Sequence, residues 1–216
     1  FLPVLVFLMP LVMIASILLS LLAGQSINQL TLASEFNIMD GSPLLSLTIP
    51  ILAPALEEMG WGGYGIDSLR SKCNLFLTSL IFGVLWGVWH LPLFFIKCYY
   101  HHSLATENIV YAVNFFISVL PLTFLTNWLY YRNGRSILGA IIFHVSTVLS
   151  AEMFLVTNQT KCIVTVVLAL VAAVLVWKNR REFFESPARV SYAPYRRRGG
   201  VRLVNVRFLN LGEFIG

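Results

Sequence analysis

The sequence predicts an all-α fold, a polytopic transmembrane helical bundle of about six spans. Its 216 residues are 57% hydrophobic and only 12% charged, and the mean hydropathy is +0.78. Soluble domains carry about 25% charged residues, so the chain has roughly half the charge that a water-facing surface needs. A helix of about 20 apolar residues crosses a bilayer, and apolar stretches of about that length recur along the chain. A soluble globular domain is therefore excluded.

Six apolar segments are the candidate spans, and they divide the chain into three parts. The segments are 1–23, 43–60, 74–96, 109–130, 136–156 and 162–177. We expect 1–42 to form a first span and an outer loop, 43–177 a single membrane domain, and 178–216 a basic cytoplasmic tail. The chain begins with Phe1 rather than Met, which indicates a truncated N-terminus. Because the opening segment has no basic start, it is predicted as a span and not as a signal peptide.

Basic residues in the loops predict the orientation. The loops near 61–73 and 131–135 lie on the same side as the tail, and the basic residues of that side are Arg70, Lys72, Arg132, Arg135, Lys178, Arg180, Arg181, Arg189, Arg196, Arg197, Arg198, Arg202 and Arg207. The opposite side has only Lys97 and Lys161. Since cytoplasmic loops carry the excess of Lys and Arg, we expect an integral protein of the plasma membrane with a cytoplasmic tail. That tail would contact anionic lipid headgroups, and no nucleic-acid partner is expected.

Four ionisable residues fall inside the predicted spans, namely Glu57, Glu58, His90 and His144. A charge in a span is costly, so such a residue is a functional-site hypothesis by default. Taken singly, a buried histidine is more often structural, and a carboxylate near a span end can reach the interface. Two glutamates and two histidines in one small bundle favour a shared site. Glu152 ranks lower because it lies near the outer end of its span.

The segment that carries the glutamates has an unusual backbone composition. Neighbouring residues on a helix point about 100° apart, so we expect one glutamate to face a cavity as a base and the other to orient partners behind it. Pro50 and Pro54 precede the pair and remove backbone donors. Four glycines follow between positions 60 and 65, and they permit close backbone approach or a tight turn.

The first histidine ends a stripe of rings. Phe82, Trp86 and His90 are spaced four residues apart and therefore line one helix face. Gly83 and Gly87 form a GxxxG pair, which allows another helix to pack closely. Straight spans would place His90 about 24 Å and His144 about 12 Å from the cytoplasmic end. Either tilting brings the two histidines together or span three begins outside the bilayer, in a helix around 70–74, and we expect the latter.

These residues allow two kinds of chemistry, and both give hydrolysis. His90, His144 and Glu57 could hold a zinc ion, which would lower the pKa of a bound water toward about 7. Alternatively, glutamate and histidine could activate water without a metal by general-base chemistry. The cysteines Cys73, Cys98 and Cys162 have no CxxC spacing, so they indicate neither a zinc knuckle nor a redox motif.

Three motifs resemble the CAAX-protease and bacteriocin-processing (ABI) family of intramembrane proteases. The segment Glu57-Glu58-Met59-Gly60-Trp61 resembles its Glu-Glu-x-x-x-Arg motif, the segment from Trp86 to Phe95 its aromatic-x-x-x-His motif, and the segment from Asn133 to His144 its second histidine motif. The resemblance implies a helical core around a cavity open to the cytosol, with endopeptidase activity on prenylated or other membrane-associated proteins. It makes Glu57 the glutamate that activates water, with Glu58 beside it. His90 and His144 would polarise the water or ligate zinc.

Two positions depart from the family pattern. Gly62 stands where an arginine is expected, and Val148 where an Asn or Asp is expected four residues after His144. The candidates to compensate for the missing polar group are Asn114, Asn127, Ser146 and Thr147. The departures motivate an alternative function, a catalytically weakened member that acts in bacteriocin self-immunity or as a membrane scaffold. A transporter would need repeated broken helices, and the sequence has none.

Overall fold

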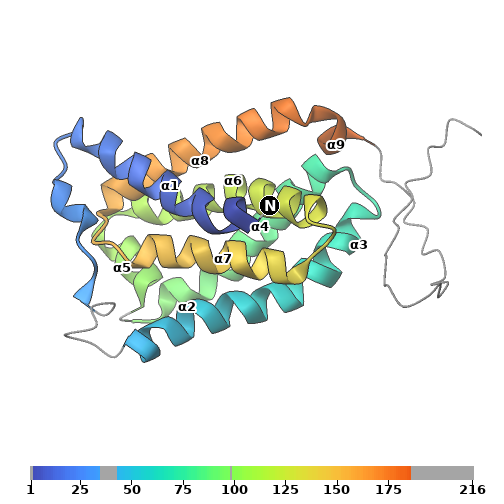
Figure 1. The fold of residues 1–216 in the computed structure, drawn as a ribbon. Helices are drawn as coiled ribbons and strands as arrows, with labels where there is room; N and C mark the ends of the chain where they lie inside the picture. The colour runs from blue at the N-terminus through green and yellow to red at the C-terminus, as the bar shows by residue number, and fades with distance from the viewer. Residues whose placement is uncertain (1, 35–42, 98, 186–216) are drawn as a thin grey trace, which may run out of the picture.

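The computed structural model describes residues 2–34, 43–97 and 99–185, and within them the chain folds as a bundle of helices (Figure 1). The elements in chain order are α1 (Leu2–Leu21), η1 (Ile27–Leu30), α2 (Pro43–Glu57), η3 (Glu58–Gly65), α3 (Ile66–Arg70), α4 (Leu75–Trp89), η4 (Leu91–Phe95), α5 (Tyr100–Glu107), α6 (Ile109–Arg132), α7 (Ile137–Glu152), α8 (Asn158–Lys178) and α9 (Arg180–Phe184). The predicted all-α membrane bundle is confirmed.

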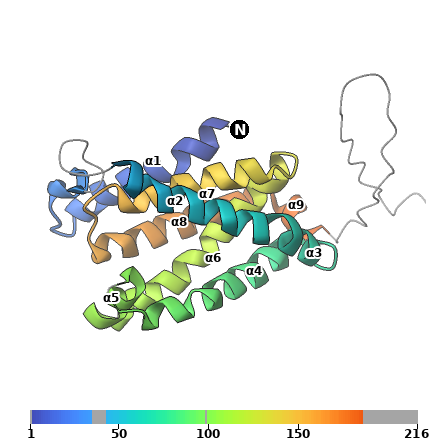
Figure 2. The ribbon, with the colours of Figure 1, turned by 90° about the horizontal axis from the view of Figure 1, so that it is seen from below.

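Each predicted span coincides with a helix. Among the described residues, four segments are long and apolar enough to cross a bilayer, and these are Leu2–Leu21, Leu75–Phe95, Ile109–Arg132 and Asn158–Lys178. The other two, α2 and α7, are shorter, with 15 and 16 residues. Both carry site residues and lie side by side in the two views (Figures 1 and 2). The predicted basic tail lies largely outside the described residues, and the three-part division of the chain stays a prediction.

Short polar side chains fix where four of the helices begin. Asn74 accepts a hydrogen bond from the Leu77 amide at the start of α4, and Asn108 does the same for α6. Ser136 caps α7 and Thr157 caps α8. A residue of this kind satisfies one of the amides left unpaired at a helix N-terminus. The turns between the apolar segments therefore set the register of the helices.

Small residues on α4 bring it into close contact with α6. A Cβ at Gly83 would lie 2.7 Å from the Thr123 hydroxyl and 3.0 Å from a methyl of Leu120. A Cβ at Gly87 would meet Phe116 at 3.4 Å. This close packing is what the GxxxG spacing predicts, and it fixes the face of α4 that carries Trp86.

The glutamate segment stays helical throughout. Pro50 and Pro54 lie inside α2, and the chain continues through the π-helix η3 directly into α3. The glycines therefore make no tight turn, and their role is close approach, since a Cβ at Gly63 would lie 3.2 Å from Ile137 on α7. π-Helical turns are rare, and those that occur are often found at functional sites. The π-helix η3 begins at Glu58, directly after Glu57, so its position favours a functional role for this segment.

Candidate active site

Glu58 and His144 form a buried pair between η3 and α7. The Nδ1 atom of His144 donates to Oε1 of Glu58 over 2.9 Å, and the side chains of His144 and Glu58 are only 8% and 7% exposed. A carboxylate can only accept, so the bond places the proton of a neutral His144 on Nδ1 and leaves Nε2 as an acceptor. The arrangement is the one by which a carboxylate orients an imidazole in hydrolases.

Glu57 turns away from its neighbour and toward α4. The indole Nε1 of Trp86 donates to Oε2 of Glu57 over 3.0 Å, and Glu57 is half-buried. The structure therefore gives the two glutamates different partners on different helices, as the helical geometry of adjacent residues requires.

His90 and His144 both lie against Trp86. The ring of Trp86 meets His90 at 5.6 Å and His144 at 5.1 Å between centroids, in both cases edge to face. The Nδ1 atom of His90 donates to the Trp86 carbonyl over 2.7 Å, so its Nε2 is also left as an acceptor. The two histidines thus converge, although the expected extension of span three is wrong, because α3 ends at Arg70 and α4 begins only at Leu75.

The predicted zinc ligands His90, His144 and Glu57 do not gather as a three-ligand cluster. In the described parts of the chain, no three His, Cys, Asp or Glu side chains gather closely enough to hold a metal ion. The bond to His144 comes from Glu58 and not from Glu57, the carboxylate of the predicted zinc set.

The carboxylate of Glu58 fills the space next to Gly62. A Cβ built at Gly62 would lie 2.7 Å from Oε2 of Glu58. In this chain the carboxylate that bonds His144 therefore occupies the space next to the position where the family pattern has its arginine.

The residues expected to compensate for Val148 make their bonds elsewhere. The Asn127 amide donates to Ser79 on α4 over 3.1 Å. Ser146 donates to the carbonyl of Val6 on α1, and Thr147 to the carbonyl of Phe143 in its own helix. Asn114 is half-buried on α6. Among these bonds none reaches His144, so the polar group of the family pattern has no direct replacement in them.

A third histidine, His101 on α5, lies against the site and was not predicted from the sequence. Its ring stacks on His90 at 5.5 Å and meets Phe115 at 4.5 Å. It is buried, and within the described residues neither ring nitrogen has a hydrogen-bond partner. Burial, followed by the neighbouring His90, lowers the pKa of His101 to about 4. The only signal in the sequence is its position in the aromatic run that follows span three.

Glutamates and histidines that meet between the helices of a membrane bundle are the groups that an intramembrane protease would need to activate water. Comparison with known proteins agrees: the model of the Rce1-like family, described as type II CAAX prenyl endopeptidase, matches residues 40–150. The CAAX prenyl protease 2 of Methanococcus maripaludis is 42% identical over 184 residues, which are 85% of this chain and 67% of that protein. The chain belongs to the type II CAAX prenyl endopeptidase family, Rce1-like.

The match includes the whole of the site. Residues 40–150 contain both glutamates and both histidines. The resemblance to an intramembrane CAAX-type endopeptidase, stated from three short motifs, is confirmed by the comparison.

Proposed function

We propose that the chain hydrolyses a peptide bond near the C-terminus of a prenylated, membrane-associated protein, with water activated by glutamate and histidine. The observation that carries the proposal is the buried bond between Glu58 and His144 beside the Trp86-bound Glu57. In a low-dielectric site, groups held in this way need no reorganisation when charge develops on the substrate.

In the proposed reaction Glu57 is the general base. Trp86 holds Oε2 of Glu57, which leaves Oε1 to take a proton from water. The water oxygen bonds to the scissile carbonyl carbon, the carbon–nitrogen bond breaks, and the proton passes from Glu57 to the leaving amine. The second hydrogen of the water is accepted by Nε2 of His144 or of His90, which orients the water for attack, and Glu58 fixes the tautomer of His144.

Orientation is part of the proposal. The charged ends of α3, α6 and α9 lie at the same end of the bundle (Figures 1 and 2), and this end carries Arg70, Arg132 and Arg181. Under the positive-inside rule it faces the cytoplasm. We propose that the protein resides in the plasma membrane with its C-terminal tail on this side.

Val148 favours one alternative function, a weakened member that acts in immunity or as a scaffold. Its apolar side chain, one turn after His144, offers the site no hydrogen bond. A chain of this kind would keep the fold and lose turnover, so the activity of the wild type separates the two functions.

The experiment is a cleavage assay in lipid nanodiscs. The purified chain is incubated with a farnesylated peptide that ends in a CAAX sequence and with the same peptide lacking the lipid, and the products are identified by mass spectrometry. We expect release of the last three residues from the lipidated peptide and much slower release from the other. No release from either peptide would refute the proposed function and support the weakened member.

A further inference from the structure

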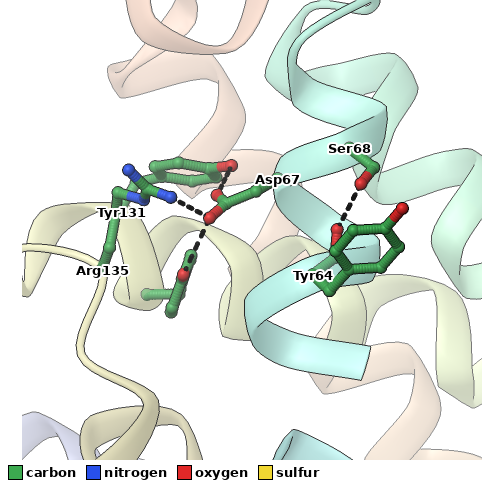
Figure 3. A network of polar contacts seen from close by, with 6 residues as sticks. Tyr64, Asp67, Ser68, Tyr131 and Arg135 are labelled. Carbon is green, nitrogen blue, oxygen red and sulfur yellow. Dashed lines mark hydrogen bonds and ion pairs between the residues drawn. The ribbon is translucent and has the colours of Figure 1, made fainter. Parts of the chain in front are cut away.

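Asp67 is the centre of a polar cluster at the charged end of the bundle (Figure 3). Its carboxylate forms an ion pair with Arg135 and accepts hydrogen bonds from the Tyr131 hydroxyl at 2.8 Å and the Tyr130 hydroxyl at 3.3 Å. The side chains of Arg135 and Asp67 are 30% and 19% exposed, so the pair is partly shielded from water. Burial alone would lower the pKa of Arg135, but its interactions with Asp67 and Tyr130 together outweigh this effect and raise the pKa.

The cluster joins the same two segments that the active-site pair joins. Asp67 follows Glu58 by nine residues, and Arg135 precedes His144 by nine residues. The segment from Glu58 to Asp67 runs through η3 into α3, and the segment from Arg135 to His144 enters α7. The two segments therefore meet at two points, once at the buried bond and once at the ion pair.

The packing between these two points is tight. A Cβ at Gly63 would lie 3.2 Å from Ile137, so η3 and the first turn of α7 are in direct contact between the two polar links. A displacement of one segment along the other at the ion pair would be transmitted to Glu58 and His144, because a close-packed contact cannot absorb it.

The backbone at Arg135 is held in an unusual conformation. Arg135 has φ 62°, the positive value that only glycine adopts easily, and it follows Gly134 at φ 65°. Its amide donates to the Tyr130 carbonyl over 2.8 Å. A residue kept in the left-handed region is over-determined by its surroundings. Here the turn between α6 and α7 directs the Arg135 side chain at Asp67.

We propose that Asp67 and Arg135 are positioning residues that set the distance between Glu58 and His144. The family pattern has an arginine at the position of Gly62, where it could act directly on the glutamates. In this chain Arg135 supplies a fixed cation instead, and it is held by Asp67 on α3, the helix that follows η3. The inference rests on the proposed function, because it assigns a role to the glutamate–histidine pair in hydrolysis.

The same end of the bundle offers a matched control. Arg132, three residues before Arg135, forms an ion pair with Glu182 and a hydrogen bond to Asn179 at 3.2 Å. These bonds tie α6 to α9 and do not involve the glutamate segment. Arg132→Ala therefore removes one cation and one ion pair from the same membrane face without touching the proposed clamp.

The test compares Arg135→Gln, Arg135→Lys, Asp67→Asn and Arg132→Ala in nanodiscs by two measurements. The first is hydrogen–deuterium exchange of the amides in 58–66 and 137–144, which needs no substrate. The second is the kcat and KM for a farnesylated CAAX peptide. We expect Arg135→Gln and Asp67→Asn to increase exchange in both segments and to lower kcat about tenfold with KM changed less than about twofold, since misplacing a reacting group by a fraction of an ångström has effects of this size.

Arg135→Lys keeps the cation and should recover part of kcat, and Arg132→Ala should match the wild type in both measurements. Unchanged exchange in the two segments for Arg135→Gln and Asp67→Asn would overturn the proposal, as would an equal loss of kcat in Arg132→Ala. If the wild type cleaves no peptide, the proposed function fails on its own, and the exchange data still decide whether Asp67 and Arg135 hold the two segments together.

Discussion

The Nδ1 atom of His144 and the Oε1 atom of Glu58 lie 2.9 Å apart in a site that is almost closed to water. The bond connects residues 86 positions apart, and it joins the π-helical segment to α7. It fixes which nitrogen of His144 carries the proton and which is left to face the site. The same pair therefore affects both the stability of the bundle and its chemistry.

Substitutions at Glu58 should separate these two effects. Glu58→Gln can still accept the His144 proton through its amide oxygen, so we expect a modest loss of kcat, about tenfold. Glu58→Ala leaves a buried imidazole N–H unpaired, which costs about 1–3 kcal/mol, so this variant should both unfold more easily and lose more activity. Thermal unfolding in detergent and the peptide assay measure the two. If both variants had the melting temperature and the rate of the wild type, the bond would matter to neither property.

Gly62 should not tolerate a side chain without loss of activity. A Cβ there would lie 2.7 Å from the Glu58 carboxylate, and that carboxylate is the end of a flexible side chain, so the carboxylate moves and the fold survives. We expect Gly62→Ala to lower kcat about tenfold with little change in melting temperature, and Gly62→Arg to create no new activity.

Gly60→Ala is the control for this substitution, because a Cβ at Gly60 meets nothing within 4 Å. It should keep wild-type activity. If Gly62→Arg combined with Val148→Asn produced activity in a silent wild type, the weakened-member alternative would be correct.

His101 should make the protein less stable in mild acid. Its pKa is lowered from 6.5 to about 4 in the fold, so between these values the unfolded chain binds a proton that the folded chain does not. Stability then falls as the pH drops from about 6.5 toward 4. Melting temperatures at pH 7 and pH 5 should differ by several degrees in the wild type and by less in His101→Phe.

His102→Phe provides the comparison for this prediction. His102 neighbours His101 but is only half-buried, and its Nδ1 bonds the Phe94 carbonyl over 2.9 Å. A His101→Phe variant with the full pH dependence of the wild type would contradict the assignment.

Removal of metal ions should leave the reaction intact. In the described residues, no three His, Cys, Asp or Glu side chains converge as metal ligands, and the proposed base needs none. We expect unchanged kcat after treatment with 1,10-phenanthroline and EDTA, measured with the farnesylated peptide. Loss of activity that zinc alone restores would favour the metal-dependent scheme instead.

The helices could be predicted because membrane insertion imposes a strong pattern. Length and hydropathy place the helices of all six predicted spans within a few residues, since a helix in lipid must satisfy its own backbone and bury no charge without a partner. The stripe of Phe82, Trp86 and His90 follows from helical spacing alone. In the structure the ring of Trp86 contacts the rings of both Phe82 and His90. The four candidate site residues could be identified because an ionisable side chain within a membrane span is energetically costly.

The pairing of those residues could not be predicted, because it depends on the local geometry of non-neighbouring segments. Nothing in the sequence shows that the glycines extend a helix as η3, which directs Glu58 to His144 and Glu57 to Trp86. His101 was not predicted because it lies in a predicted loop, where an ionisable side chain has no energetic cost. Only the structure shows that it is buried against His90. Asp67 and Arg135 lie in predicted loops, and only the turn at Gly134 brings them together.

The most direct test of the account is the turnover of Glu57→Gln on a farnesylated CAAX peptide in nanodiscs, beside the wild type and Glu152→Gln. Glu152 is an exposed carboxylate at the end of α7, so its variant should cleave like the wild type. General-base catalysis contributes about 10²–10⁴-fold, and Glu57→Gln should therefore lose at least about 100-fold in kcat with an unchanged melting temperature. Wild-type turnover by Glu57→Gln would contradict the central role assigned to this glutamate.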